Sequence, residues 1–149
     1  MKPVHNGIPQ GSPVSPILAA YYSAELLEKF AITPDGPNPA LHERTPSKPS
    51  PINIIVYVDD GKIYVSSTSL HTNVILLRLA YKEVAEWLNN AGLAPDLNKR
   101  EIMHYSRRKK YDCSPPITLQ DVDGSTKTLV PDKVVKWLGV HFDKKLRFH

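Results

Sequence analysis

The chain has 149 residues, of which 41% are hydrophobic and 23% charged, a balance that supports a folded core and excludes a fully disordered polymer. A single cysteine excludes an intrachain disulfide framework and fits an intracellular chain, and no apolar run approaches the roughly 20 residues needed to span a bilayer. The net charge of +4 favours a polyanionic partner without defining it.

The N-terminal third predicts a loop, a helix and a proline-rich break. Gly, Pro and Ser dominate residues 7–16 (GIPQGSPVSP), which is typical of a structured loop. A helix is expected from Pro16 to about Phe30, because Ser15 can act as its N-cap and proline suits the first helical position. Residues 33–51 hold six of the 14 prolines, so we expect an extended surface loop there.

The middle of the chain predicts a β-hairpin followed by a long helix. Residues 52–58 and 62–67 are rich in Ile, Val and Tyr, as strands are. The residues between them, Asp59-Asp60-Gly61, are turn formers. Apolar side chains then recur at helical spacing over residues 70–91.

The C-terminal third predicts short strands. We expect these at residues 101–105, 117–119, 127–130 and 134–142, and the sequence VDGST at 122–126 favours pairing of the second with the third. Strands joined by tight turns, combined with two helices, indicate an α+β fold with a mainly antiparallel sheet.

Asp59 and Asp60 place two like charges in a row near the tip of the predicted hairpin. At a turn both carboxylates can point toward one location, where they repel unless a cation lies between them. Mg²⁺ prefers hard oxygen ligands and suits such a pair. An ordinary turn with solvated aspartates explains the same residues, and the motif alone favours that simpler interpretation.

Four segments resemble, in the same order, the motifs of reverse transcriptases. They are NGIPQGSPVSPILAAYYSAEL (6–26), YVDDGKIYVSS (57–67), LNKREIMHYSRR (97–108) and VVKWLGVHFDKKLRF (134–148). The Gly-x-Pro-Gln-Gly-Ser-Pro form of the first is similar to that of non-LTR, LINE-type retrotransposons. The resemblance covers nearly the whole chain, and residues 31–51 are the least similar part.

The resemblance implies the C-terminal part of a polymerase palm, in which the Asp-Asp hairpin of a mainly antiparallel sheet packs against two helices. It implies RNA-directed DNA synthesis on an RNA template and a DNA primer, with deoxynucleoside triphosphates as substrates. Two Mg²⁺ ions are the implied cofactors, with Mn²⁺ as the alternative. No membrane is involved, and the family points to the nucleus as the expected compartment.

The same resemblance implies roles for individual residues. Asp59 and Asp60 match the metal-binding catalytic pair, and Lys99 matches a lysine near the triphosphate that donates a proton to the leaving pyrophosphate. The implied nucleotide and template contacts are Pro9, Gln10, Gly11, Ser12 and Tyr57, and the implied primer grip is Trp137, Leu138 and Gly139. Without this context, Lys99 is simply one of 19 basic residues and Trp137 a core residue.

The basic run SRRKK at residues 106–110 has two interpretations. It can track a nucleic-acid backbone, or it can be a solvated surface loop. The sequence leaves both open.

The departures from the family pattern lead to further expectations. No acidic residue precedes Gly7, so the palm's first catalytic aspartate has no counterpart, and the fingers and thumb motifs are also missing. We therefore expect residues 1–149 to be a partial palm that is inactive alone and associates through an exposed sheet edge. The alternatives are a non-catalytic, nucleic-acid-binding remnant of a retrotransposon, or a piece that completes a palm supplied by another chain.

Overall fold

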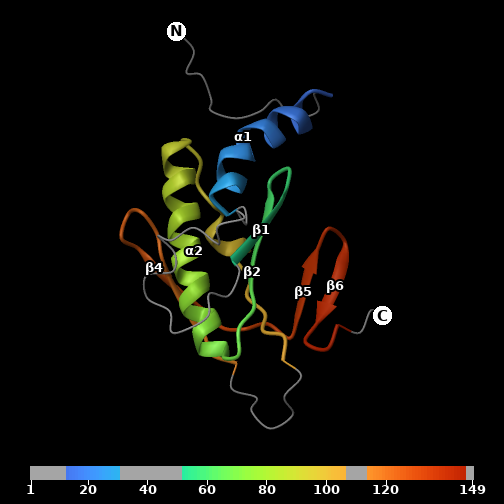
Figure 1. Ribbon diagram of the computed structural model, residues 1–149, viewed down its shortest axis with the longest axis vertical. Helices are drawn as coiled ribbons and strands as arrows, with labels where there is room; N and C mark the ends of the chain where they lie inside the picture. The colour runs from blue at the N-terminus through green and yellow to red at the C-terminus, as the bar shows by residue number, and fades with distance from the viewer. Residues whose placement is uncertain (1–12, 31–51, 107–113, 147–149) are drawn as a thin grey trace.

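The computed structural model describes residues 13–30, 52–106 and 114–146, in which helices and β-hairpins combine as the α+β class predicts (Figure 1). The helices are α1 (Ser15–Phe30), α2 (Leu70–Asn90) and the short 3₁₀ helix η2 (Leu97–Lys99). The strands are β1 (Ile52–Tyr57), β2 (Asp60–Val65), β3 (Ile117–Gln120), β4 (Thr126–Leu129), β5 (Val134–Trp137) and β6 (Val140–Asp143).

Each strand of the described chain pairs with its sequence neighbour in an antiparallel hairpin. The hairpins are β1–β2, β3–β4 and β5–β6, and they remain three separate two-stranded sheets rather than one continuous sheet. In Figure 1, β4 lies on one side of α2, and β5–β6 lies on the other side, beyond β1–β2. Short turns therefore set the pairing, and α2 packs against the β1–β2 and β3–β4 hairpins, whereas β5 and β6 pack mainly against each other.

The first core cluster joins the β1–β2 hairpin to both helices, as the sequence predicts. On α1, Ser23, Leu26 and Phe30 are buried at spacings of three and four residues, which places them on one helical face. This face packs against β1, while α2 packs against β2. The buried members of the cluster are Leu26, Phe30, Ile52, Leu76, Ala80 and Trp87.

A second core cluster lies between α2 and the β3–β4 hairpin. Ile117 and Leu119 are buried while the β3 residues next to them are exposed, which is the two-residue period of a strand with one covered face. Ile102 and Leu129 complete the buried cluster, and Val74, Leu77 and Tyr81 of α2 pack against it. Helix α2 thus separates two small cores and anchors both hairpins.

The predicted strand at 101–105 is wrong, since residues 101–106 have no regular structure. Ile102 and His104 are buried in alternation, which explains the strand-like pattern. Their hydrogen bonds, however, go to loops. The backbone N–H of Asp132 donates to the carbonyl of Ile102 at 2.8 Å, and His104 Nε2 lies 2.8 Å from the carbonyl oxygen of Pro115.

The predicted strand at 134–142 is also wrong as a single element, because it folds back on itself. Trp137 pairs with Val140, and the two residues between them form the turn of the β5–β6 hairpin. Leu138 and Gly139 both have positive φ angles, 48° and 83°, as a type I′ turn requires. The turn was missed because leucine is not a residue expected at its first central position.

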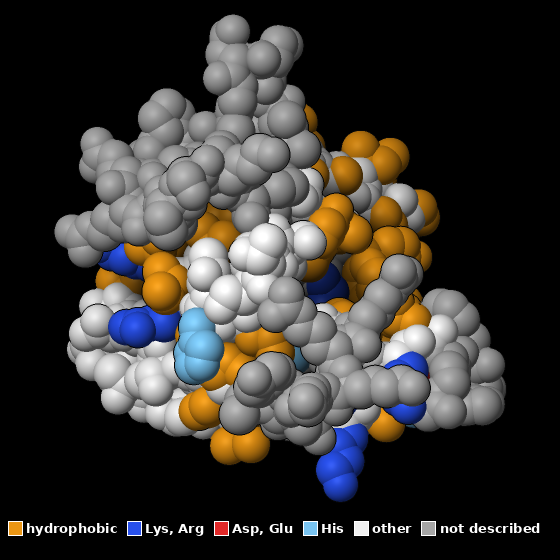
Figure 2. All heavy atoms as spheres, turned by 60° about the horizontal axis from the view of Figure 1, so that its bottom comes forward, with side chains coloured by type: hydrophobic (Ala, Val, Ile, Leu, Met, Phe, Trp, Pro, Cys, Tyr) orange, Lys and Arg blue, Asp and Glu red, His pale blue; other side chains and the backbone are white. Residues whose placement is uncertain are grey.

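Apolar side chains also reach the surface of the described chain. On α1, Ile17 and Tyr21 are 68% and 82% exposed. Figure 2 shows hydrophobic side chains interspersed with Lys and Arg on one face of the molecule. Neither described α-helix combines the length and the apolar character needed to cross a membrane.

Candidate functional site

The turn of the β1–β2 hairpin differs by one position from its prediction. Tyr57 pairs with Asp60, so the two turn residues are Val58 and Asp59, while Asp60 begins β2. Both aspartates are exposed to solvent. Tyr57 is also exposed, with a fractional exposure of 59%. The carboxylates therefore project from the hairpin tip, one from the turn and one from the start of the strand.

Val58 has a backbone conformation that is unusual for its residue type. Its φ is 56°, and a β-branched residue with positive φ is an outlier in proteins. Such a conformation costs on the order of 1–3 kcal/mol and persists only where the surrounding structure imposes it. The strained residue lies directly before Asp59, so the tight turn and the orientation of the acidic pair are linked.

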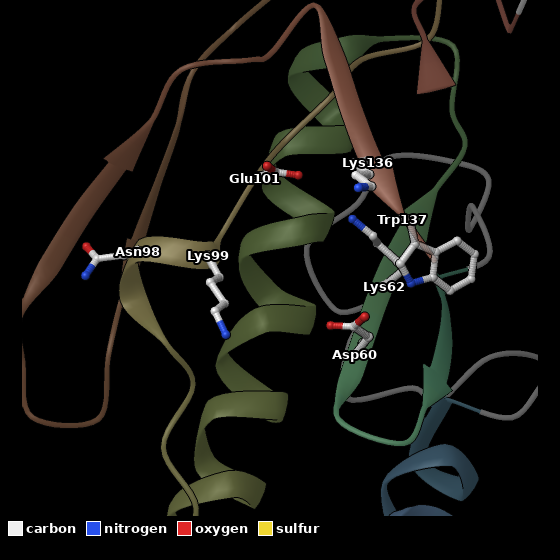
Figure 3. A pocket seen from close by; sticks show the side chains of 8 residues that line it. Asp60, Lys62, Asn98, Lys99, Glu101, Lys136 and Trp137 are labelled. Carbon is white, nitrogen blue, oxygen red and sulfur yellow. The ribbon is translucent and has the colours of Figure 1, made fainter. Parts of the chain in front are cut away.

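A pocket of about 360 Å³ lies beside this hairpin. It brings together Asp60, Lys99 and Trp137, which belong to three separate sequence motifs (Figure 3). The other lining residues, which the sequence did not single out, are Gly61, Lys62, Asn98, Glu101 and Lys136. The pocket is thus built from β2, the η2 region and the end of β5.

Not every predicted site residue lines this pocket. Asp59 and Tyr57 lie on the same hairpin, and Leu138 and Gly139 form the adjoining turn, but none of the four is part of the lining. Pro9, Gln10, Gly11 and Ser12 lie outside the described residues, as does most of the basic run 106–110 and the whole proline-rich segment 33–51.

Lys99 reaches the pocket from η2. Asp96 caps this short helix, since its carboxylate accepts a hydrogen bond from the backbone N–H of Asn98 at 2.9 Å. Lys99 Nζ lies 3.9 Å from Asp96 Oδ2, but their side chains are 84% and 50% exposed. An exposed pair of this kind contributes little, about 0–1 kcal/mol, and leaves the ammonium group available to a ligand.

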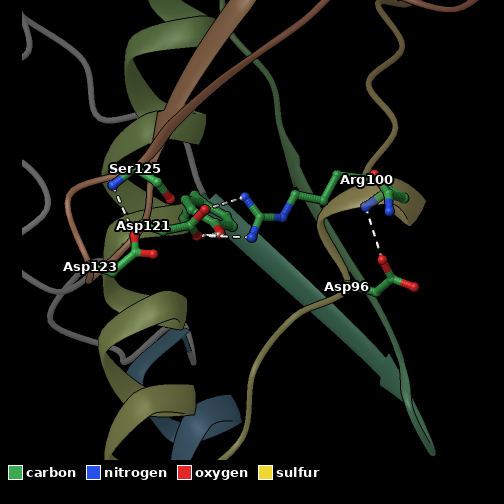
Figure 4. Close-up of polar contacts among 7 residues, drawn as sticks. Asp96, Arg100, Asp121, Asp123 and Ser125 are labelled. Atoms are coloured by element: carbon green, nitrogen blue, oxygen red, sulfur yellow. Dashed lines mark hydrogen bonds and ion pairs between the residues drawn. The ribbon is translucent and has the colours of Figure 1, made fainter.

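The residue after Lys99 is held firmly. Arg100 makes two hydrogen bonds to the Asp121 carboxylate, 3.0 and 2.8 Å long, and its guanidinium carbon lies 4.9 Å from the centre of the Tyr81 ring (Figure 4). The Tyr81 hydroxyl donates to the same carboxylate. This three-residue cluster ties the η2 region to α2 and to the β3–β4 turn.

The electrostatics of this cluster favour an ionised Asp121 and a neutral Tyr81. Hydrogen bonds from the Arg100 guanidinium hold the pKa of Asp121 below its usual value, with a smaller contribution from the Tyr81 hydroxyl. Burial raises the pKa of Tyr81, and its hydrogen bond to the Asp121 carboxylate raises it further. The sequence carried no signal of this cluster.

The acidic residues fit a divalent cation only in part. In the described portions of the chain, no group of three or more His, Cys, Asp or Glu side chains could hold a metal ion. Asp59 and Asp60 offer adjacent hard oxygen donors, and Mg²⁺ commonly combines one or two carboxylates with phosphate oxygens of a substrate. The hairpin therefore suits an ion that is bound jointly with a phosphate ligand.

Comparison with known proteins gives one match. A family model described as reverse transcriptase (RNA-dependent DNA polymerase) matches residues 1–142. The matched range contains the hairpin, η2 and β5, and hence every residue that lines the pocket. Comparisons with curated proteins and with solved structures give no match.

Proposed function

The chain belongs to the reverse transcriptase (RNA-dependent DNA polymerase) family, and we propose that it forms part of the palm of an RNA-directed DNA polymerase of the non-LTR, LINE type. The observation that carries the proposal is the convergence of Asp60, Lys99 and Trp137 on one pocket. If each motif served only its local turn or helix, residues from three motifs far apart in sequence would not be expected to meet in one pocket.

The acidic pair and Lys99 have defined roles in this proposal. Asp59 and Asp60 hold Mg²⁺, or Mn²⁺ in its place, together with the triphosphate of a deoxynucleotide. Lys99 lies near the triphosphate, where a positive charge stabilises the negative charge that develops on the leaving pyrophosphate. Bound Mg²⁺ supplies Lewis-acid stabilisation of the phosphoryl oxygens.

The remaining matched residues position the nucleic acid. Trp137, Leu138 and Gly139 hold the primer strand at the end of β5, and Tyr57 lies beside the acidic pair near the primer end. Pro9, Gln10, Gly11 and Ser12 contact the incoming nucleotide and the template base. An RNA template and a DNA primer are accordingly the macromolecular partners.

The 149-residue chain by itself is proposed to be inactive in polymerisation. The matched motifs supply two carboxylates to the hairpin, whereas a two-ion site needs further anionic ligands to clamp the attacking and leaving oxygens. Nucleotide and metal binding are therefore better first tests than primer extension.

The experiment measures joint binding of Mn²⁺ and dATP to the full chain by electron paramagnetic resonance. We expect Mn²⁺ to bind in the presence of dATP, and the Asp59→Asn/Asp60→Asn variant to lose at least about tenfold in affinity, which corresponds to about 1.4 kcal/mol for the loss of both carboxylates. Glu25→Gln/Glu28→Gln is the matched control, because it removes two exposed carboxylates from α1.

Equal losses in both double variants would contradict the proposal. So would Mn²⁺ binding that is indifferent to dATP. Binding of a primer–template duplex that needs neither a divalent ion nor the two aspartates would instead favour the non-catalytic, nucleic-acid-binding alternative. The three lysines that line the pocket are also consistent with that alternative.

A further inference from the structure

Two lysines that no motif assigns point into the pocket near Trp137. Lys62 comes from β2 and Lys136 from β5, and in Figure 3 their side chains approach the same space. Neither forms an ion pair with another residue in the described part of the chain. Lys62 is half-buried and Lys136 is exposed.

Trp137 adds a donor without a partner at this end of the pocket. Its indole Nε1 is buried and has no hydrogen-bond partner. A buried donor without an acceptor is unfavourable, and two neighbouring ammonium groups repel each other. An anionic oxygen at this place would relieve both penalties.

The Lys62–Lys136 end of the pocket is distinct from the end that carries Asp60, the member of the acidic pair that lines the pocket. Asp60 and Lys62 are two residues apart on β2, so their side chains share one face of the strand, about 7 Å apart along it. Three lysines against the carboxylates of Asp60 and Glu101 leave the lining net positive. An anion is repelled near the carboxylates and is favoured at the Lys62–Lys136 end.

We propose that Lys62, Lys136 and the indole N–H of Trp137 form a phosphate subsite, next to the Asp59–Asp60 pair at the hairpin tip but distinct from that pair. A phosphate of a nucleic-acid strand and a phosphate of a free nucleotide share the chemistry that these donors recognise. The evidence for the subsite is the set of three donors. The role of the subsite in polymerisation rests on the proposed function.

The first experiment titrates the full chain with inorganic pyrophosphate in EDTA, followed by calorimetry, so that no metal ion bridges protein and ligand. We expect Lys62→Gln/Lys136→Gln to weaken binding about tenfold or more, because it removes two charge-assisted hydrogen bonds to the ligand. Lys62→Arg/Lys136→Arg keeps both charges and should stay within about threefold of the parent.

Two further variants test the geometry. Lys82→Gln/Lys133→Gln removes the same net charge from exposed positions outside the pocket and should leave the affinity nearly unchanged. Trp137→Phe removes the N–H and should weaken binding about threefold or more. Circular dichroism confirms that each variant is folded.

Competition with a short single-stranded DNA and with dATP identifies the source of the phosphate. Displacement of pyrophosphate by the strand at lower concentration assigns the subsite to a backbone phosphate, and the reverse order assigns it to the nucleotide. Either order supports a phosphate subsite, provided that it depends on Lys62 and Lys136.

Absence of pyrophosphate binding by the parent chain would overturn the subsite. An equal loss in the off-pocket variant would also overturn it, because the effect would then be general electrostatics. Asp59→Asn/Asp60→Asn separates the two proposals. We expect this variant to retain pyrophosphate binding in EDTA. If it does, and if the parent chain fails to bind Mn²⁺ and dATP jointly, the polymerase proposal is contradicted and the phosphate subsite is supported.

Discussion

Arg100 and Asp121, 21 residues apart, form a two-point ion pair that fastens the residue after Lys99 to the β3–β4 turn. Their side chains are only 9% and 14% exposed. The planar guanidinium matches the carboxylate at both oxygens and also lies over the Tyr81 ring. The position of Lys99 beside the pocket therefore depends on an interaction that lies outside it.

Removing the charge of Asp121 should be among the most damaging substitutions. Asp121→Asn leaves the nearly buried Arg100 without a counter-ion, and breaking a buried pair from one side costs about 3 kcal/mol. The free energy of unfolding, measured by chemical denaturation, should fall accordingly. Glu86→Gln disrupts the exposed Lys82–Glu86 pair, 3.8 Å long, and should change stability by no more than about 0.5 kcal/mol. Similar losses for the two variants would show that the Arg100 pair is not special.

The same pair predicts loss of stability in acid. The pKa of Asp121 is lowered in the folded chain, chiefly by the Arg100 hydrogen bonds, while an unfolded aspartate titrates near about 3.9. The unfolded state thus binds the proton more readily. The contribution of Asp121 is complete above the unfolded pKa and is lost as the pH falls through 4 toward the folded pKa.

Comparison of the parent chain with Asp121→Asn isolates this effect. Asp123, whose pKa is lowered by hydrogen bonds from Ser125, is present in both proteins, so its contribution cancels except for the effect of the nearby Asp121 charge, which raises the pKa of Asp123 in the parent chain alone. We expect the parent chain to lose more unfolding free energy between pH 6 and pH 3 than the variant does. Parallel pH profiles would contradict the assignment of this acid sensitivity to Asp121.

The fold was predictable wherever a local pattern was sufficient. Both predicted helices are present, and the apolar stripe of α2 packs against the two cores. The stripe predicted for α1 from Ile17, Tyr21 and Leu27 is wrong, because these side chains are exposed and Ser23, Leu26 and Phe30 are buried instead.

The other failures concern turns and loops. Asp59-Asp60-Gly61 was expected to be the turn because a valine with positive φ has no sequence signal, and residues 101–105 alternate in burial without joining a ladder.

The site was predictable as separate residues but not as an arrangement. Motifs pointed to Asp60, Lys99 and Trp137, yet only the folded arrangement of β2, the η2 region and β5 brings them to one pocket. Lys62 and Lys136 were overlooked because lysine is common on surfaces and neither position belongs to the matched functional residues. Long-range partners such as Arg100 and Asp121 leave no periodic trace in the sequence.

The turn of the β5–β6 hairpin offers a matched pair of glycine substitutions. Gly139 has a φ of 83°, and an added Cβ would meet no atom within 4 Å, so Gly139→Ala tests backbone conformation alone. We expect it to lower the free energy of unfolding by about 1–2 kcal/mol. Gly61→Ala, where space is equally open and φ is not positive, should be neutral or stabilising by up to about 1 kcal/mol. Equal effects on the thermal midpoint would contradict the role of the positive φ.

Replacing Val58 by glycine is expected to raise stability and to weaken metal binding. Val58→Gly should relieve backbone strain of about 1–3 kcal/mol, less the about 0.5–1 kcal/mol that glycine costs through its freedom in the unfolded chain. The net gain in unfolding free energy should be about 1 kcal/mol. The more flexible turn should hold Asp59 and Asp60 less firmly, so joint Mn²⁺–dATP binding should weaken. Val56→Gly, in the adjoining strand where φ is ordinary, should destabilise the hairpin instead. A less stable Val58→Gly protein would show that the valine conformation is unstrained, and unchanged metal binding would show that strain at the turn does not orient the carboxylates.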